Sequence, residues 1–221
     1  MANGYLTGCA LAICILICIV YFLKERVDNK ETKLFQYMIF CNLAESFFTN
    51  MIVLVAMTVN STFLFKILNR LDVMAIISWL TLMFLYISNV YNGNEYDKTK
   101  RFIMIVDSIF FLFTLILDVE IIASNEVLDS KGPLPNFALL VGGFFIVLML
   151  LRVFTNKKKD FFNKKLVPMY FLIFFLIAMV FLRLALPSVN FVSIIISFVN
   201  LIMIFTIENP DIKMINALNE A

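Results

Sequence analysis

The chain has 221 residues, of which 62% are hydrophobic and 15% charged, with a formal net charge of +2. Soluble domains are about 45–50% apolar, so this composition excludes a small soluble globule and indicates a protein that lipid solvates. The chain has no histidine, which excludes a His-ligated metal, a bis-histidine haem, a Ser-His-Asp triad and a phospho-accepting histidine in this segment. We therefore expect neither an enzymatic activity nor a cofactor here.

Seven apolar stretches approach the length of about 20 residues that a helix needs to cross a bilayer. Continuous apolar runs exclude the alternating pattern of a membrane barrel, so we predict an all-α bundle of seven transmembrane helices. The first stretch is followed by no small-x-small cleavage site and is predicted to be a span, not a signal peptide. In chain order the stretches are 4–23, 35–59, 72–92, 102–123, 136–154, 167–186 and 188–207.

The four cysteines lie inside these apolar stretches, where a thiol behaves as a small apolar side chain. We predict that they are neither disulfide-bonded nor metal ligands. Three are in the first stretch and one in the second: Cys9, Cys14, Cys18 and Cys41.

Basic residues are distributed unevenly between the loops. The first, third and fifth loops carry thirteen of the 18 Lys and Arg residues, whereas the second, fourth and sixth carry only Lys66, Arg70 and Lys131. Because Lys and Arg favour cytoplasmic loops, the N-terminus is predicted outside and the C-terminus in the cytoplasm. The lysine run 157–159 is then an anchor at an anionic lipid surface rather than a nucleic-acid patch.

The loops predicted outside are short. Segment 60–71 mixes apolar and polar residues and is expected at the interface, and segment 124–136 contains turn-forming Gly132, Pro133 and Pro135. Neither offers room for an external ligand-binding domain. A stimulus must then be detected within the membrane or at its outer rim.

The C-terminal segment has the signals that begin a helix. Asn209 is an N-cap residue, Pro210 suits the first helical position, and Asp211 places an acid in the first turn. We predict a break after residue 207 and a new polar helix on the cytoplasmic side. The chain then divides into a membrane domain, 1–207, and the beginning of a connector, 208–221, with Asn209 and Pro210 as signal relay.

Segment 205–221, FTIENPDIKMINALNEA, resembles the exit from the membrane region of bacterial hybrid sensor histidine kinases, where an ENPD step opens a signalling helix. Segment 21–33, YFLKERVDNKETK, is similar to the first cytoplasmic loop of such proteins. The resemblance implies a sensor domain of a two-component system in the bacterial inner membrane. Its implied partners are membrane lipid, a second copy through the signalling helix, a cytoplasmic kinase domain and a response regulator, with no nucleic acid. Diguanylate cyclases carry similar membrane regions.

Ionisable residues inside apolar stretches are candidate sites, because each costs at least about 2.5–3.5 kcal/mol on insertion scales. Glu45 lies near the middle of the second stretch and shares a helix face with Asn42, while Asp107 lies five residues inside the fourth. Glu45 is either a protonated carboxyl hydrogen-bonded to a neighbouring helix or a carboxylate that senses a stimulus or binds an ion.

Asp118 and Arg183 lie at matched depths near the outer ends of the fourth and sixth stretches. They form either an ion pair that fixes helix packing or a polar gate for a ligand. In the first case Asp118→Asn or Arg183→Leu alone would destabilise the bundle, and exchanging the two charges would restore part of the loss.

Three further features are expected to serve packing. Trp79 is predicted to be buried in the third stretch, and Gly142 and Gly143 to allow close helix approach. Asn200 could reach the depth of Asp107 and is expected to hold helices together by hydrogen bonding.

The main alternative function is a small seven-helix transporter. Such carriers need repeated, proline-hinged units, whereas here no proline lies within the first five stretches. A retinal protein would need a lysine in the last stretch, which 188–207 lacks. An intramembrane enzyme would need an ordered motif of acidic residues. A membrane sensor remains the better interpretation.

Overall fold

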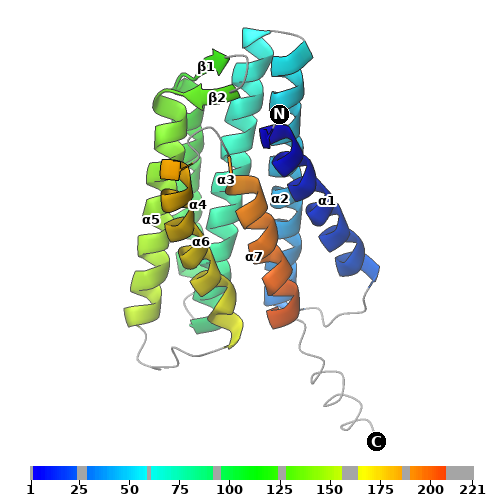
Figure 1. The fold of residues 1–221 in the computed structure, drawn as a ribbon. Helices are drawn as coiled ribbons and strands as arrows, with labels where there is room; N and C mark the ends of the chain where they lie inside the picture. The colour runs from blue at the N-terminus through cyan, green and yellow to red at the C-terminus, as the bar shows by residue number, and fades with distance from the viewer. Residues whose placement is uncertain are drawn as a thin grey trace, which may run out of the picture.

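The computed structural model describes residues 2–23, 29–58, 61–91, 96–123, 128–155, 164–185 and 190–207, with the backbone alone for 2–3, 121–123, 128–129, 180 and 183–185. These residues form seven α-helices, one short 3-10 helix and one β-hairpin (Figure 1). In chain order they are α1 Ala2–Leu23, α2 Lys30–Thr58, α3 Thr62–Tyr91, α4 Tyr96–Ile116, β1 Glu120–Ala123, β2 Leu128–Lys131, α5 Pro133–Thr155, η1 Lys164–Leu166, α6 Val167–Ala185 and α7 Val192–Ile207.

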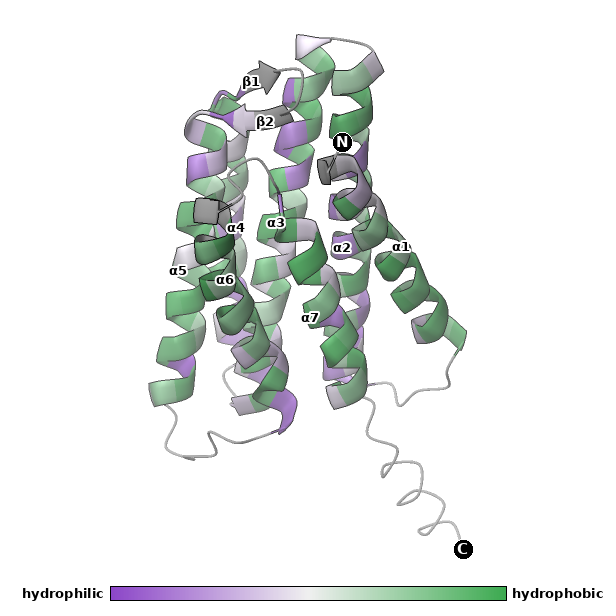
Figure 2. Ribbon diagram, in the orientation of Figure 1, coloured by the Kyte–Doolittle hydropathy of each residue, from purple (hydrophilic) through white to green (hydrophobic). Residues whose placement is uncertain are grey.

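The predicted seven-helix fold is confirmed, and four of the helices (α1, α2, α3 and α5) are long and apolar enough to cross a membrane. Hydrophobic residues cover most of the length of α1, α5, α6 and α7 (Figure 2). Large apolar side chains face outward, as Leu23, Leu140 and Phe205 do, whereas polar side chains lie inside the bundle. This arrangement suits a lipid solvent, and the chain has the features of a multi-pass membrane protein.

Helix α3 is at the centre of the bundle. It packs along α2, α4 and α5, while α7 packs along α1, α2 and α6 (Figure 1). Helix α3 carries the two largest fully buried side chains among the described residues, Trp79 and Tyr86. Helices α3 and α7 thus each pack against three other helices, and α2 packs against both of them.

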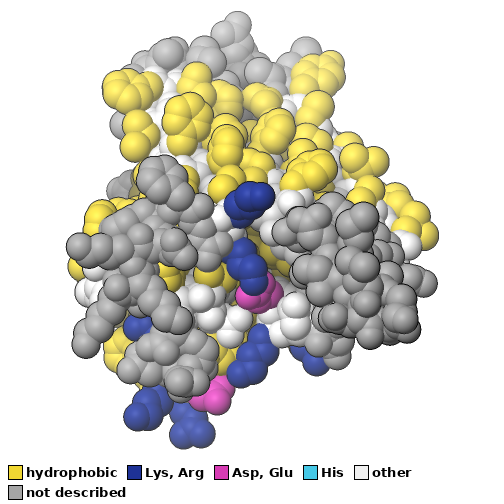
Figure 3. Space-filling model, turned by 90° about the horizontal axis from the view of Figure 1, so that it is seen from below, with side chains coloured by type: hydrophobic (Ala, Val, Ile, Leu, Met, Phe, Trp, Pro, Cys, Tyr) yellow, Lys and Arg dark blue, Asp and Glu magenta, His cyan; other side chains and the backbone are white. Residues whose placement is uncertain are grey.

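Most of the described basic side chains gather at one end of the bundle. The beginnings of α2, α4 and α6 and the ends of α1, α3, α5 and α7 lie together there, and Figure 3 views this end with its Lys and Arg side chains. Lys165 of η1 forms an ion pair with Glu31 of α2 at 2.8 Å. The three residues predicted in outside loops, Lys66, Arg70 and Lys131, belong to the opposite end.

The predicted loop over 60–71 is wrong, because α3 begins at Thr62. Ser61 Oγ accepts a hydrogen bond from the backbone N–H of Leu64 at 3.4 Å, which satisfies one of the free donors of the first turn. Phe65 from this turn is fully buried. Phe65 faces the bundle, whereas Phe63 and Leu64 of the same turn are exposed, so the mixed pattern of this segment is that of a helix with one face inward and one outward.

The predicted helix over 102–123 is also wrong at both ends, since α4 spans Tyr96–Ile116. After it the chain forms an antiparallel hairpin in which Glu120 pairs with Lys131 and Ala123 with Leu128. Gly132 has a φ of 118°, a value that favours glycine, and the helix that follows begins at Pro133. The apolar residues after Ile116 explain why a longer helix was predicted, but those at 120–123 belong to a strand.

Two other helix boundaries depend on asparagine caps. Asn29 Oδ1 accepts from the Thr32 N–H at 2.8 Å at the start of α2, and Asn190 Oδ1 accepts from the Val192 N–H at 3.0 Å. Helix α7 begins at Val192, later than the predicted span 188–207. All four cysteines are free, as predicted.

Candidate functional site

A strip of polar side chains runs along the inner face of α2. Asn42, Glu45, Ser46 and Thr49 are each at most 5% exposed. Their spacing (i, i+3, i+4, i+7) places them on one face of the helix, as was predicted for Asn42 and Glu45. Polar groups buried in a membrane bundle need partners from neighbouring helices, and these define the site.

Glu45 accepts hydrogen bonds from three hydroxyl groups. Ser193 of α7 donates at 2.5 Å, Ser46 at 3.2 Å and Thr49 at 3.3 Å. The contact with Ser193 joins the middle of α2 to the first turn of α7. Glu45 is therefore held by hydrogen bonds to its own and a neighbouring helix, as one of the two predicted roles requires.

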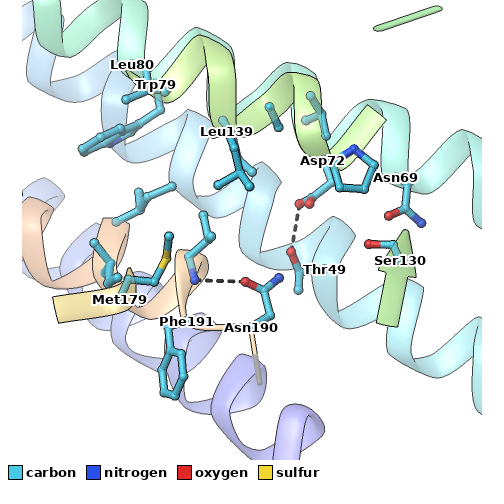
Figure 4. Close-up of a pocket in the computed structure, with 18 of the residues that line it drawn as sticks. Thr49, Asn69, Asp72, Trp79, Leu80, Ser130, Leu139, Met179, Asn190 and Phe191 are labelled. Carbon is cyan, nitrogen blue, oxygen red and sulfur yellow. Dashed lines mark hydrogen bonds between the residues drawn. The ribbon is translucent and has the colours of Figure 1, made fainter. Parts of the chain in front are cut away.

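A second buried carboxyl group lies beside Glu45. Asp72 of α3 accepts a hydrogen bond from Thr49 Oγ1 at 2.8 Å (Figure 4). Because Thr49 Oγ1 is also 3.3 Å from Glu45, one threonine hydroxyl contacts both acids. A hydroxyl has a single proton, and it can be donated to only one of the two carboxyl groups at a time. Within the described part of the chain, no Lys or Arg forms an ion pair with either acid.

Helix α7 presents three polar residues at intervals of four and three. These are Ser193, Ser197 and Asn200. The Ser197 hydroxyl can donate either to Asn42 Oδ1 at 3.3 Å or to the carbonyl oxygen of Ala10 at 3.4 Å. Asn200 Oδ1 accepts from the indole N–H of Trp79 at 3.0 Å. We call Ser193, Ser197 and Asn200 the α7 ladder. It connects the last described helix to α1, α2 and α3 at three levels.

Two of the predictions about packing residues are resolved by these contacts. Trp79 is fully buried, as predicted, and Asn200 does join helices by a hydrogen bond, although its described partner is Trp79. Asp107 is half-buried and accepts a hydrogen bond from Thr81 at 2.8 Å, which links α4 to α3. Among the described contacts, Asp107 shares no hydrogen bond with Glu45 or Asn42.

Asp118 does not lie within a helix, contrary to the prediction, because α4 ends at Ile116. It forms an ion pair with Lys66 of α3 at 2.7 Å, and both side chains are exposed. The hydrogen bond from Lys66, with one from the backbone N–H of Val119, lowers the pKa of Asp118. The side chain of Arg183 lies outside the described residues, so its pairing with Asp118 stays a prediction.

The predicted signal relay, Asn209 and Pro210, also lies outside the described residues. The last described residue of α7 is Ile207.

Beside the carboxyl pair lies a cavity of about 390 Å³. It is bounded mainly by α2, α3, α5, α6 and α7, with Thr7 of α1 and Ser130 of the hairpin at its edge (Figure 4). Most of its wall is apolar, and Trp79 forms part of it. Its polar lining residues are Thr7, Thr49, Asn69, Asp72, Ser130 and Asn190. The carboxyl group of Asp72 is thus both part of the buried network and part of the cavity wall.

The predicted role of Gly142 and Gly143 in close helix approach is wrong. A Cβ atom built on either residue meets no described heavy atom within 4 Å, so no neighbouring helix presses against them. Both glycines instead line the cavity. The absence of side chains there leaves space inside the bundle.

Four residues of the site were not predicted from the sequence: Thr49, Asp72, Ser193 and Ser197. The signal was present in part, because Ser193, Ser197 and Asn200 recur at helical spacing within an otherwise apolar stretch. Asp72 was assigned to the first position of the third span, at a membrane boundary. Asp72 in fact lies ten residues inside α3, and its side chain is buried.

The site combines a pair of buried carboxyl groups, a polar ladder on α7 and a cavity that reaches one of the carboxyl groups. Such an arrangement can bind a small molecule and change how α7 packs against α2 and α3. No protein-family model and no curated protein matches this chain.

Proposed function

We propose that the chain is the membrane sensor module of a signalling protein and that α7 carries the signal to a cytoplasmic output. The α7 ladder is the observation on which this depends. Each of its three residues forms a buried hydrogen bond to another helix, through Glu45, Asn42 and Trp79. A change in the spacing of α2 and α3 would therefore move α7, the helix that leads into segment 208–221.

The mechanism follows from the directional nature of these contacts. A ligand or membrane change that alters the cavity acts on Asp72, and through Thr49 on Glu45 and Ser193. Hydrogen bonds have narrow geometric limits, so the ladder favours discrete arrangements of α7 over a continuous range. The output type that best accords with the resemblance is a histidine kinase acting on a response regulator. A diguanylate cyclase is the alternative output.

The proposed topology has seven transmembrane helices with the N-terminus outside and the C-terminus in the cytoplasm. A reporter enzyme active only in the cytoplasm should be active when fused after Lys30, Lys98 or Lys159, because the positively charged loops stay inside. It should be inactive after Asn60 or Lys131. Activity after Lys131 would overturn this topology, because an external N-terminus would then require an odd number of membrane crossings before Lys131.

The coupling through α7 predicts a helical phase dependence of output. We expect insertions of one to four residues after Pro210 in the full-length gene to raise and lower output in turn. Each inserted residue rotates the downstream helix by about 100°, so the register alternates between favourable and unfavourable positions. The measurement is phosphoryl transfer to the response regulator in native membranes.

The matched control places the same insertions after Lys157, between α5 and α6, where they should leave output almost unchanged. Output that is indifferent to every insertion after Pro210, or a gene that encodes no output domain, argues against the sensor. The carboxyl pair and the cavity would then favour a proton-coupled carrier, in which intramembrane acids mark the substrate pathway.

A further inference from the structure

We propose that the cavity binds a small amphipathic cation, with its ammonium group on Asp72 and its hydrocarbon part along α5 and α6. The site is the stimulus site of the sensor, and in this respect the inference rests on the proposed function. Binding itself is a separate property and can be measured without any output.

The charge of the ligand is argued from the surroundings of Asp72. Its side chain is buried, and its described hydrogen bond comes from Thr49, a hydroxyl that also contacts Glu45. The nearest cations along α3 are engaged elsewhere, since Lys66 pairs with Asp118 and Arg70 donates to the carbonyl oxygen of Leu117. An ammonium group would provide Asp72, the acid that lines the cavity, with the positive charge that the described residues do not supply.

The remainder of the ligand is argued from the apolar part of the cavity wall. Leu139 of α5, Leu172, Leu176 and Met179 of α6 and Ile195 of α7 form an apolar surface. The volume of about 390 Å³ lies in the range of small-molecule sites, about 300–1,000 Å³. An apolar body with one charged end therefore matches the cavity, whereas a strongly polar ligand would leave most of the wall unmatched.

The cavity contains its own reporter. Trp79 is the single tryptophan of the chain, is fully buried, and lines the cavity. Its indole N–H donates to Asn200 of the α7 ladder. A molecule that enters the cavity therefore contacts the residue that joins α3 to α7, and the same contact changes the fluorescence of the protein.

The experiment uses the full chain in lipid nanodiscs and three probes of equal length: heptylamine, 1-heptanol and heptanoate. We expect a saturable change in Trp79 emission with heptylamine at an apparent affinity at least tenfold higher than with 1-heptanol. Heptanoate should bind least, because its charge repels the carboxyl pair. This comparison needs no substitution and is independent of any effect of a variant on folding.

Variants then locate the binding site. Asp72→Asn should lower the heptylamine affinity at least tenfold and leave the 1-heptanol affinity unchanged, while Gly142→Leu should weaken both because it fills the cavity. Asp107→Asn removes a half-buried acid outside the cavity and should change neither affinity. Equal affinity for the three probes, or an Asp72→Asn variant that binds heptylamine normally, would overturn the cation site. A response without saturation would exclude binding in the cavity.

Two further measurements separate the possible ligands and the two proposals. A heptylamine affinity that falls when phosphatidylethanolamine is added to the nanodisc identifies a lipid headgroup amine as the competitor, and an unchanged affinity identifies a free amine. In the full-length protein, heptylamine should shift output. Saturable binding with no shift in output would support the cation site and contradict the sensor function.

Discussion

Replacement of Trp79 by alanine is expected to lower the free energy of unfolding in lipid by about 2–3 kcal/mol. Trp79 is fully buried between α3 and α7, so its removal leaves a void that rigid helices cannot close. The value lies below the roughly 3–5 kcal/mol of soluble proteins, because the unfolded chain in a membrane is also in an apolar solvent. Unfolding in mixed micelles with increasing SDS would measure the change.

The matched control is Trp79→Phe, which keeps most of the ring volume but removes the indole donor. It leaves Oδ1 of Asn200 without its partner and should cost about 1 kcal/mol, within the range of membrane hydrogen bonds. Equal losses for the alanine and phenylalanine variants would show that the hydrogen bond, and not the packing, stabilises this contact.

Replacement of Glu45 by alanine is expected to cost about 2 kcal/mol. Glu45 is 1% exposed and accepts from Ser193, Ser46 and Thr49, so its loss deprives several buried hydroxyl groups of an acceptor at once. The loss of this acceptor affects Ser193 most, because its other described hydrogen bond, to Thr49, is 3.4 Å long. The same SDS titration applies, with the loss expressed relative to the unaltered chain.

Glu45→Gln is the conservative variant. It retains a carbonyl acceptor for Ser193 and nearly the same volume, so its cost should stay below about 1 kcal/mol. Asp118→Asn, at an exposed position, should change stability by no more than about 0.5 kcal/mol. If glutamine and alanine at position 45 destabilise equally, an ionised carboxylate, and not its acceptor function, is what the bundle requires.

The sequence by itself determined the number of helices and most of their positions. The predicted stretches 4–23, 136–154 and 167–186 agree with α1, α5 and α6 to within a few residues. This succeeds because the length of an apolar run is a local property, and a membrane converts it directly into a helix of that length. The shared helix face of Asn42 and Glu45 was likewise predicted, because helical spacing is a local property.

The helix end that was predicted wrongly, near residue 116, depends on pairing between two separate segments of the chain. Residues 117–123 are apolar apart from two acids, but Glu120–Ala123 forms β1 because Leu128–Lys131 lies alongside as β2. Asp118 then lies outside the bundle, where Lys66 from the beginning of α3 reaches it. Hydropathy carries no information about such a partner.

Only the tertiary structure decided the composition of the site. Glu45 meets Ser193 across 148 positions of the chain, and Trp79 meets Asn200 across 121. The sequence marks each of these residues as polar or bulky in an apolar helix, yet many helix arrangements would satisfy them equally well. The choice between these arrangements depends on how seven helices pack at once. That packing brings Asp72 beside Glu45 and leaves a cavity next to Gly142 and Gly143.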